Sequence, residues 1–206
     1  DIQHGLQGKN HLAYNSWHRV PPKGYTLLPD TFWVWSELDK KHLESWFNPQ
    51  QHRAIIGGNP WIAFYLENTE RIDPVVDEIK PTKNQQKFIL LTIASLEEFV
   101  DHWIVNAIRD MQHEYLFGIR IHPAMRYQLD EMKLFFNQKG ILHVELSQSN
   151  ELSIFSLFKR CDIHLTFLST AAIEACYFQK PSAVIHELGK VYYESEIAEG
   201  ILQYLA

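Results

Sequence analysis

The chain has 206 residues, of which 46% are hydrophobic and 21% are charged, and its formal net charge is −6. The length allows one good-sized α/β domain, or one domain together with a piece of another. Nucleic-acid binding needs clustered Lys and Arg, whereas the adjacent basic pairs here are only Lys40-Lys41 and Lys159-Arg160, so that class is excluded. No apolar run approaches the roughly 20 residues that span a bilayer.

The two cysteines indicate the redox compartment of the protein, and the first residues indicate that the chain is part of a longer one. Cys161 and Cys176 are too few for a disulfide framework, so we expect buried free thiols in a reducing compartment, the cytoplasm. The chain begins with Asp1 rather than Met, and Gln3-His4-Gly5 resembles a strand end that runs into a glycine turn. We therefore expect a fragment or an excised domain, with a further part upstream.

The first part of the chain predicts a loop-rich unit with little regular structure. Short strands are predicted over 32–35 and 53–56, with a helix over 37–47 between them, and Gly57-Gly58-Asn59-Pro60 is a strong turn signal. Residues 67–86 are charged and polar without a sustained period, which is typical of a linker. We assign residues 1–60 to the end of a preceding domain, 61–81 to a linker, and 82–206 to a separate regular domain.

From Lys87 onward, apolar strands alternate with amphipathic helices. Strands are predicted over 88–92, 115–121, 142–144, 163–167 and 183–185, and helices over 129–139, 151–159 and 171–178. Another helix opens at a capping box of Ser95 and Glu98, and its apolar face contains Phe99, Val100, Trp103, Ile104, Ala107, Ile108 and Met111. Gly140 follows the 129–139 helix at a position that favours left-handed backbone. The alternation predicts an α/β fold, a Rossmann-like parallel sheet with helices on both faces.

Polar residues follow each predicted strand directly, and in such folds these positions meet at the ligand-binding edge of the sheet. In chain order they are Ser95, His122-Pro123, Ser147, Ser169-Thr170 and His186-Glu187.

Among these residues, the pair Ser169-Thr170 most specifically indicates a phosphate-binding site. It begins a helix rich in small residues, whose free N–H groups and partial positive charge suit a phosphate. The alternative is a simple N-cap. Glu174, one turn further on, either reaches a ribose hydroxyl or is an ordinary solvated helix residue.

Three other residues are candidates for binding a phosphate or for proton transfer to a leaving group. His122 can donate to phosphate or protonate a departing oxygen, and Arg120 in the preceding strand can add charge. A structural His and a solvent-facing Arg are the alternatives. His4 is a candidate catalytic base or phosphate ligand.

Several function classes lack their signature in this sequence. His4, His11 and His18 recur every seven residues, but in a segment without a helical pattern, so they do not predict a metal site. There is no Walker motif, no G-x-G-x-x-G, no paired CxxC and no nucleophile elbow.

The order of these short motifs resembles the later part of GT-B glycosyltransferases of bacterial surface-polysaccharide synthesis. The motifs are Gln3-His4-Gly5, the 33–36 strand, the 55–60 turn, His122-Pro123, the 162–166 strand, Ser169-Thr170, Glu174-Ala175 and Lys180-Pro181. The pattern is similar also to UDP-N-acetylglucosamine 2-epimerases and teichoic-acid glycerophosphotransferases. The HP and Ser/Thr motifs also resemble those of sialyltransferases and Kdo transferases, which use CMP-sugars.

The resemblance implies that residues 1–60 end the acceptor-side domain and that 82–206 bind a UDP- or CMP-sugar. Ser169 and Thr170 would hold its phosphates with Ser95, Arg120 and Pro123 nearby, and Glu174 would contact the ribose. His122 would touch phosphate or the departing oxygen, and His4 would face the reacting sugar across a cleft. No metal is expected to be obligatory, and catalysis is expected to need both halves.

The implied function is glycosyl transfer onto a carbohydrate or lipid-linked acceptor, for surface polysaccharide or lipopolysaccharide, in the cytoplasm or at the inner face of the membrane. Peripheral membrane association through a missing region fits this function. The alternatives are a sugar-nucleotide epimerase and a non-catalytic nucleotide-sugar binding module. Against the epimerase, Glu174 lacks an adjacent acidic residue and Thr170-Ala171 replaces the usual glycine pair.

Overall fold

The chain forms two compact units, residues 1–64 and 65–206. The computed structural model describes residues 1–8, 10–11, 14, 26–93 and 102–205. Among these residues, no helix combines the length and the apolar character that crossing a membrane requires.

The first unit is a small parallel β-α-β arrangement. Strand β1 (Thr31–Val34) pairs in parallel with β2 (Arg53–Ile56), and helix α1 (Glu37–Glu44) connects them. Ser36 caps α1, because its side chain accepts from the Asp39 backbone N–H at 3.2 Å. The helix ends three residues before the predicted end, and Phe47 instead stacks on Phe32 with ring centroids 6.0 Å apart. The core of this unit contains Phe32, Val34, Leu43, Phe47 and Ala54.

The segment predicted to be an irregular linker contains two helices. Helix α2 (Pro60–Ile72) begins in the first unit and ends in the second, and a 3-10 helix, η1 (Pro74–Glu78), follows it. The side-chain oxygen of Asn59 accepts from the backbone N–H of Trp61 at 3.0 Å, and Pro60 occupies the first helical position. The signal taken for a turn is therefore a helix start.

The second unit is built on a six-stranded parallel sheet, which confirms the predicted Rossmann-like α/β class. Its strands are β3 (Lys87–Ile93), β4 (Tyr115–Ile121), β5 (Val144–Glu145), β6 (Ile163–Thr166), β7 (Ser182–Val184) and β8 (Gln203–Tyr204). Their order in the sheet is β5-β4-β3-β6-β7-β8. The predicted 142–144 strand is shorter and lies later, and β8 was not predicted.

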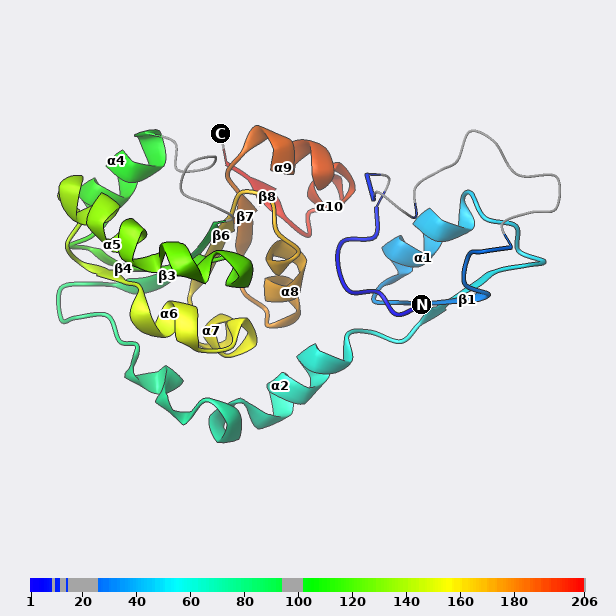
Figure 1. The fold of residues 1–206 in the computed structure, drawn as a ribbon, viewed down its shortest axis with the longest axis horizontal. Helices are drawn as coiled ribbons and strands as arrows, with labels where there is room; N and C mark the ends of the chain where they lie inside the picture. Colours follow the sequence, from blue (N-terminus) through cyan, green and yellow to red (C-terminus); the bar gives the residue numbers. More distant parts are fainter. Residues whose placement is uncertain (9, 12–13, 15–25, 94–101, 206) are drawn as a thin grey trace. The chain divides into compact units, whose positions relative to one another are not determined.

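Helices surround this sheet, as can be followed in Figure 1. They are α4 (His102–Met111), η2 (Pro123–Gln128), α5 (Leu129–Gln138), α6 (Ser147–Glu151), α7 (Ile154–Arg160), α8 (Ala171–Tyr177), α9 (Glu187–Tyr192) and α10 (Glu194–Ala198). Side chains of α4 and α5 share one apolar cluster with alternate residues of β3 and β4, whereas α6, α7 and α8 contact β4, β3, β6 and β7.

Individual helices depart from the sequence prediction. The predicted 151–159 helix is two helices, α6 and α7, with an extended break at Leu152. On α4 the buried residues are Ile104, Val105 and Ile108, while Trp103 is 46% exposed, so the predicted apolar face was partly wrong. The capping box of Ser95 and Glu98 lies outside the described residues. Gly140 has φ +73°, as predicted.

The strand order reverses beside β3, and this reversal defines the ligand-binding edge. From β3 the chain builds outward through β4 and β5, and then returns to the other side of β3 to build β6, β7 and β8. Such a topological switch point leaves a crevice at the carboxyl ends of the central strands. One residue row there contains Arg120, Thr92 and Thr166, paired in register across β4, β3 and β6.

Gly189 provides a test of how closely α9 packs on the sheet. A Cβ at this position would lie 2.2 Å from the backbone oxygen of Phe167 and 2.2 Å from Cγ1 of Val184. Gly189→Ala should add about 1 kcal/mol of stability through its higher helix propensity. The added methyl group should cost about 1–3 kcal/mol of stability through overpacking, because the backbone oxygen has little room to move. We expect a net loss of stability in urea unfolding, with the exposed residue of α10 changed in Ser195→Ala as the control. Unchanged or increased stability would contradict this close packing.

Candidate functional site

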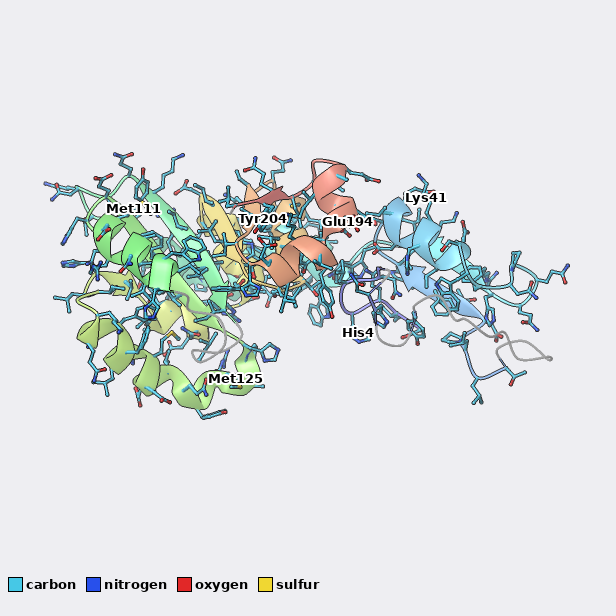
Figure 2. The ribbon with its side chains drawn as sticks, turned by 90° about the horizontal axis from the view of Figure 1, so that it is seen from above. His4, Lys41, Met111, Met125, Glu194 and Tyr204 are labelled. Carbon is cyan, nitrogen blue, oxygen red and sulfur yellow. The ribbon has the colours of Figure 1, made fainter. Side chains whose placement is uncertain are left out.

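A pocket opens at the switch point of the second unit, with about 430 Å³ of space that includes open solvent at its mouth. It is lined by Thr92, Ile93, Arg120, Ile121, His122, Pro123, Ile154, Thr166, Leu168 and Ser169. Met111 precedes β4 and Met125 follows it, and Figure 2 shows the two residues well apart. The pocket lies at the edge of the sheet where β4 ends, because His122 and Pro123 line it. Four residues that the sequence singles out, Arg120, His122, Pro123 and Ser169, are therefore brought together, from segments up to 49 residues apart in the chain.

Arg120 is a buried cation in the wall of this pocket, which corrects the solvent-facing alternative. Its side chain is 9% exposed, and its Nη1 donates to the backbone oxygens of Ser149 at 2.8 Å and Leu152 at 2.7 Å. Burial lowers the pKa of Arg120 to about 10, with a further lowering from Arg126 and an opposing effect from Asp73. The guanidinium therefore stays charged at neutral pH, yet it forms no ion pair with any carboxylate in the described part of the chain.

His122 presents a defined nitrogen at the mouth of the pocket. It is the N-cap residue of η2, and its Nδ1 accepts from the backbone N–H of Ala124 at 3.2 Å. Because Nδ1 is an acceptor, the neutral ring carries its proton on Nε2. The exposed imidazole can thus offer an Nε2–H donor to an anionic oxygen.

Ser169 and Thr170 behave differently from one another. Ser169 lines the pocket, and its hydroxyl accepts from the backbone N–H of Ala171 at 3.2 Å. Thr170 occupies the N-cap position of α8, but its side chain makes no capping hydrogen bond and does not line the pocket. The capping alternative therefore describes Ser169 better than Thr170, and the Ser169 hydroxyl hydrogen remains available as a donor.

Glu174 lies in the first turn of α8 and is half-buried, so the solvated alternative is wrong. Burial raises the pKa of Glu174 to about 7. The carboxyl group accepts no hydrogen bond from any residue that the structure describes. It lies outside the pocket lining, one helical turn beyond the start of α8.

The sequence prediction missed two threonines of the pocket and the histidine behind them. Thr92 and Thr166 line the pocket with their side-chain oxygens 2.8 Å apart, and His164 Nε2 lies 3.0 Å from Thr92 Oγ1. They lie inside apolar strand segments rather than after a strand, which is where the sequence predicts the ligand-binding residues. The sequence feature that could have indicated them is a threonine near the end of each of two strands: Thr92 lies one residue before the end of β3, and Thr166 is the last residue of β6.

The other candidates are placed elsewhere or lie outside the described residues. Ser95 belongs to the second group. Ser147 begins α6, His186 caps α9, and neither lines the pocket. In the first unit, exposed His4 lines a small depression with Gln3, Gly5, Tyr14 and Trp33 among others. Cys161 and Cys176 are free, and Cys176 is only half-buried. Within the described ranges, no group of three or more His, Cys, Asp or Glu residues is arranged to hold a metal ion.

The fold is similar to that of two known enzymes of nucleotide-sugar and cell-wall chemistry. The UDP-GlcNAc 2-epimerase from Methanocaldococcus jannaschii aligns with a TM-score of 0.56 over 86% of this chain at 18% identity. The wall teichoic acid polymerase TagF aligns with a TM-score of 0.51 over 81% of this chain at 17% identity. No protein-family model and no curated protein sequence matches the chain.

These similarities confirm the resemblance to GT-B enzymes and epimerases at the level of the fold. The chain spans 51% of the epimerase and 41% of TagF. At these identities the comparison establishes architecture, and the activity has to be argued from the pocket.

The titration of Glu174 gives a pH-dependent prediction for stability. The folded protein holds a proton on Glu174 up to about pH 7, whereas the ordinary value is 4.5, so stability falls as the pH rises between these values. Glu174→Gln cannot titrate. We therefore expect its free energy of unfolding, relative to the parent chain, to rise from pH 4.5 to 7 and then level off. Chemical unfolding at several pH values measures this difference, with exposed Glu131→Gln as the control. A difference that is constant across the range would contradict the burial of this carboxyl group.

Proposed function

We propose that residues 65–206 are the donor-binding domain of a GT-B glycosyltransferase that uses a nucleotide-activated sugar. The observation that carries this proposal is the buried, charged Arg120 in the wall of a switch-point pocket, where no carboxylate of the described residues lies within ion-pair distance and Asp73 acts on it only from further away. A buried cation is costly unless it is compensated. An anionic group of the ligand, such as a nucleotide phosphate, would compensate it.

In this proposal the remaining pocket residues bind the rest of the donor. The His122 Nε2–H and the Ser169 hydroxyl donate to phosphate oxygens, and Pro123 packs beside them. Thr170 and Glu174 follow along α8, where Glu174 is the candidate for the ribose, and Ser95 remains a candidate donor-binding residue. Charge that develops on the departing phosphate is stabilised by these donors, without an obligatory metal.

The biological setting belongs to the same proposal. The first unit would end the acceptor-side domain, with His4 as the residue that acts on the reacting sugar. The complete protein would transfer sugar to a carbohydrate or lipid-linked acceptor for bacterial surface polysaccharide or lipopolysaccharide, in the cytoplasm or at the inner face of the membrane. The support is the shared fold with TagF together with the chemistry of the pocket.

A sugar-nucleotide epimerase is the second candidate, because the M. jannaschii epimerase shares the fold. Release of free sugar and UDP from UDP-N-acetylglucosamine, with no acceptor present, would identify this reaction in the complete protein. A binding module would bind nucleotide but consume no sugar.

The first test is a thermal-shift titration of this chain with UDP, CMP, GDP and ADP, with and without EDTA. A ligand at about 100 times its dissociation constant stabilises by about 2.7 kcal/mol, which raises the melting temperature by several degrees at this size. We expect UDP or CMP to give this rise selectively, and EDTA to leave it unchanged. Absence of a shift with all four nucleotides, up to millimolar concentration, would contradict the proposal.

His122→Ala tests the role of the imidazole in the complete enzyme. If Nε2–H acts on the departing oxygen, kcat should fall about 100-fold or more, while nucleotide binding should weaken only about fivefold. His113→Ala is the matched control, since this exposed histidine precedes β4 at the opposite edge of the sheet. An unchanged kcat with weakened binding would instead show that His122 only holds the ground state.

A further inference from the structure

The peptide group between Leu152 and Ser153 links a buried cation to a carboxylate beside the pocket. Its carbonyl oxygen accepts from Arg120 Nη1 at 2.7 Å, and its N–H donates to Asp73 Oδ2 at 3.3 Å. The next residue in the chain, Ile154, lines the pocket together with Arg120. Because one peptide group separates the two charged groups, Arg120 Nη1 and Asp73 Oδ2 are at most about 8 Å apart.

Asp73 is held in this place by the start of α7. Its Oδ2 also accepts from Ser156 Oγ at 2.5 Å, and Ser156 is fully buried. Asp73 itself is half-buried and directly precedes η1, in the segment that the sequence predicts to be a linker. A residue of this segment therefore contributes its charge to the surroundings of the pocket.

The groups around Arg120 have opposite effects on its charge. Burial is the largest effect and lowers the pKa of Arg120, Arg126 lowers it further, and Asp73 raises it. Asp73 thus supplies a negative charge that favours the charged guanidinium, although the two groups form no ion pair. Charges at this separation interact more strongly when they are partly buried than in bulk water, because solvent and salt screen them less.

An anion bound beside Arg120 would have to share this cation with Asp73. A phosphate there gains the attraction of the guanidinium, but it is also repelled by the nearby carboxylate. The pocket therefore attracts an anion less strongly than an isolated buried arginine would. In the ligand-free protein, the same carboxylate reduces the cost of burying the charge of Arg120.

We propose that Asp73 is the resident counter-charge of Arg120, which stabilises the pocket without ligand and moderates its affinity for an anionic ligand. Asp73 does not touch the ligand in this proposal and acts through the field that it shares with Arg120. The inference rests on the proposed function, since it takes a nucleotide phosphate as the anion. Removal of the Asp73 charge should therefore change the stability of the free protein and its affinity for the anion in opposite directions.

Calorimetric titration of Asp73→Asn with UDP and CDP, each beside its monophosphate, tests the proposal. Asn keeps an oxygen that can accept the hydrogen bonds from Ser153 and Ser156, but it carries no charge. We expect affinity for the diphosphates to rise about three- to tenfold, and affinity for the less charged monophosphates to rise less. The ligand-free variant should melt at a lower temperature than the parent chain. Asp77→Asn, at an exposed position of η1, is the matched control.

Affinity that falls or stays unchanged in Asp73→Asn overturns the inference, since a residue with only a structural role gives one of these results. Asp73→Glu keeps the charge, and a gain in affinity as large as that of Asp73→Asn would also overturn it. If the ligand-free Asn variant is unfolded, UDP or inorganic pyrophosphate should restore its fold, and failure to do so contradicts the counter-charge.

The failure of the proposed function is distinguishable from the failure of this inference. A parent chain that binds none of the four nucleotides removes the proposed function. Inorganic pyrophosphate, which has no base or ribose, then decides the inference alone. Tighter binding of pyrophosphate by Asp73→Asn than by the parent chain supports the counter-charge, whereas equal, weaker or absent binding overturns it.

Discussion

The hydrogen bonds of the Arg120 guanidinium shape the second unit around the pocket. A continuous helix from Ser147 would use the Ser149 carbonyl to accept from the N–H of Ser153, four residues later. Instead the helix breaks at Leu152, and the Ser149 and Leu152 carbonyls accept from Arg120. The freed Ser153 N–H donates to the Asp73 carboxylate at 3.3 Å, which also accepts from Ser156 Oγ at 2.5 Å. Arg120 thus satisfies the carbonyls at the break between α6 and α7, while Asp73, which precedes η1, binds the first residues after it.

The two faces of the sheet divide the work of folding and binding. Alternate residues of β3 and β4, such as Leu91 and Ile119, join the apolar cluster with α4 and α5. The residues between them include Thr92 and Arg120, which face the side that α6 and α7 cover. Because side chains alternate along a strand, one strand can supply core packing and pocket chemistry at the same time. These polar residues lie toward the carboxyl ends of the strands, where Thr92 and Arg120 line the pocket although both are buried.

The sequence predicted the features that depend on local pattern and missed those that depend on tertiary contacts. The long apolar runs of β3 and β4 were found because strands buried on both faces leave a continuous signal. Helix α2 was missed although Asn59 and Pro60 form a regular helix start, since the preceding glycines suggested a turn. At the break at Leu152 the local sequence offers only Ser153, which caps α7, whereas the carbonyls freed by the break bind an arginine that lies 32 residues before Leu152 in the chain.

The same distinction applies to the candidate site. His122 and Ser169 were found because they follow strands directly, and Arg120 because a charge stands out in an apolar strand. Thr92 and His164 were missed, since only the register of β3 with β6 brings them together.

The contrast between His122 and His186 shows why position on the sheet outweighs residue type. Both histidines follow a strand, and in each the Nδ1 accepts from a backbone N–H two residues later, at 3.2 Å and 3.1 Å. This shared geometry places the proton of either neutral ring on Nε2. His122 follows β4, beside the reversal of strand order, whereas His186 follows β7, on the far side of β6. Both histidines cap the start of a helix, but of the two only His122 lines the pocket together with the buried guanidinium of Arg120, so only His122 is a candidate phosphate ligand.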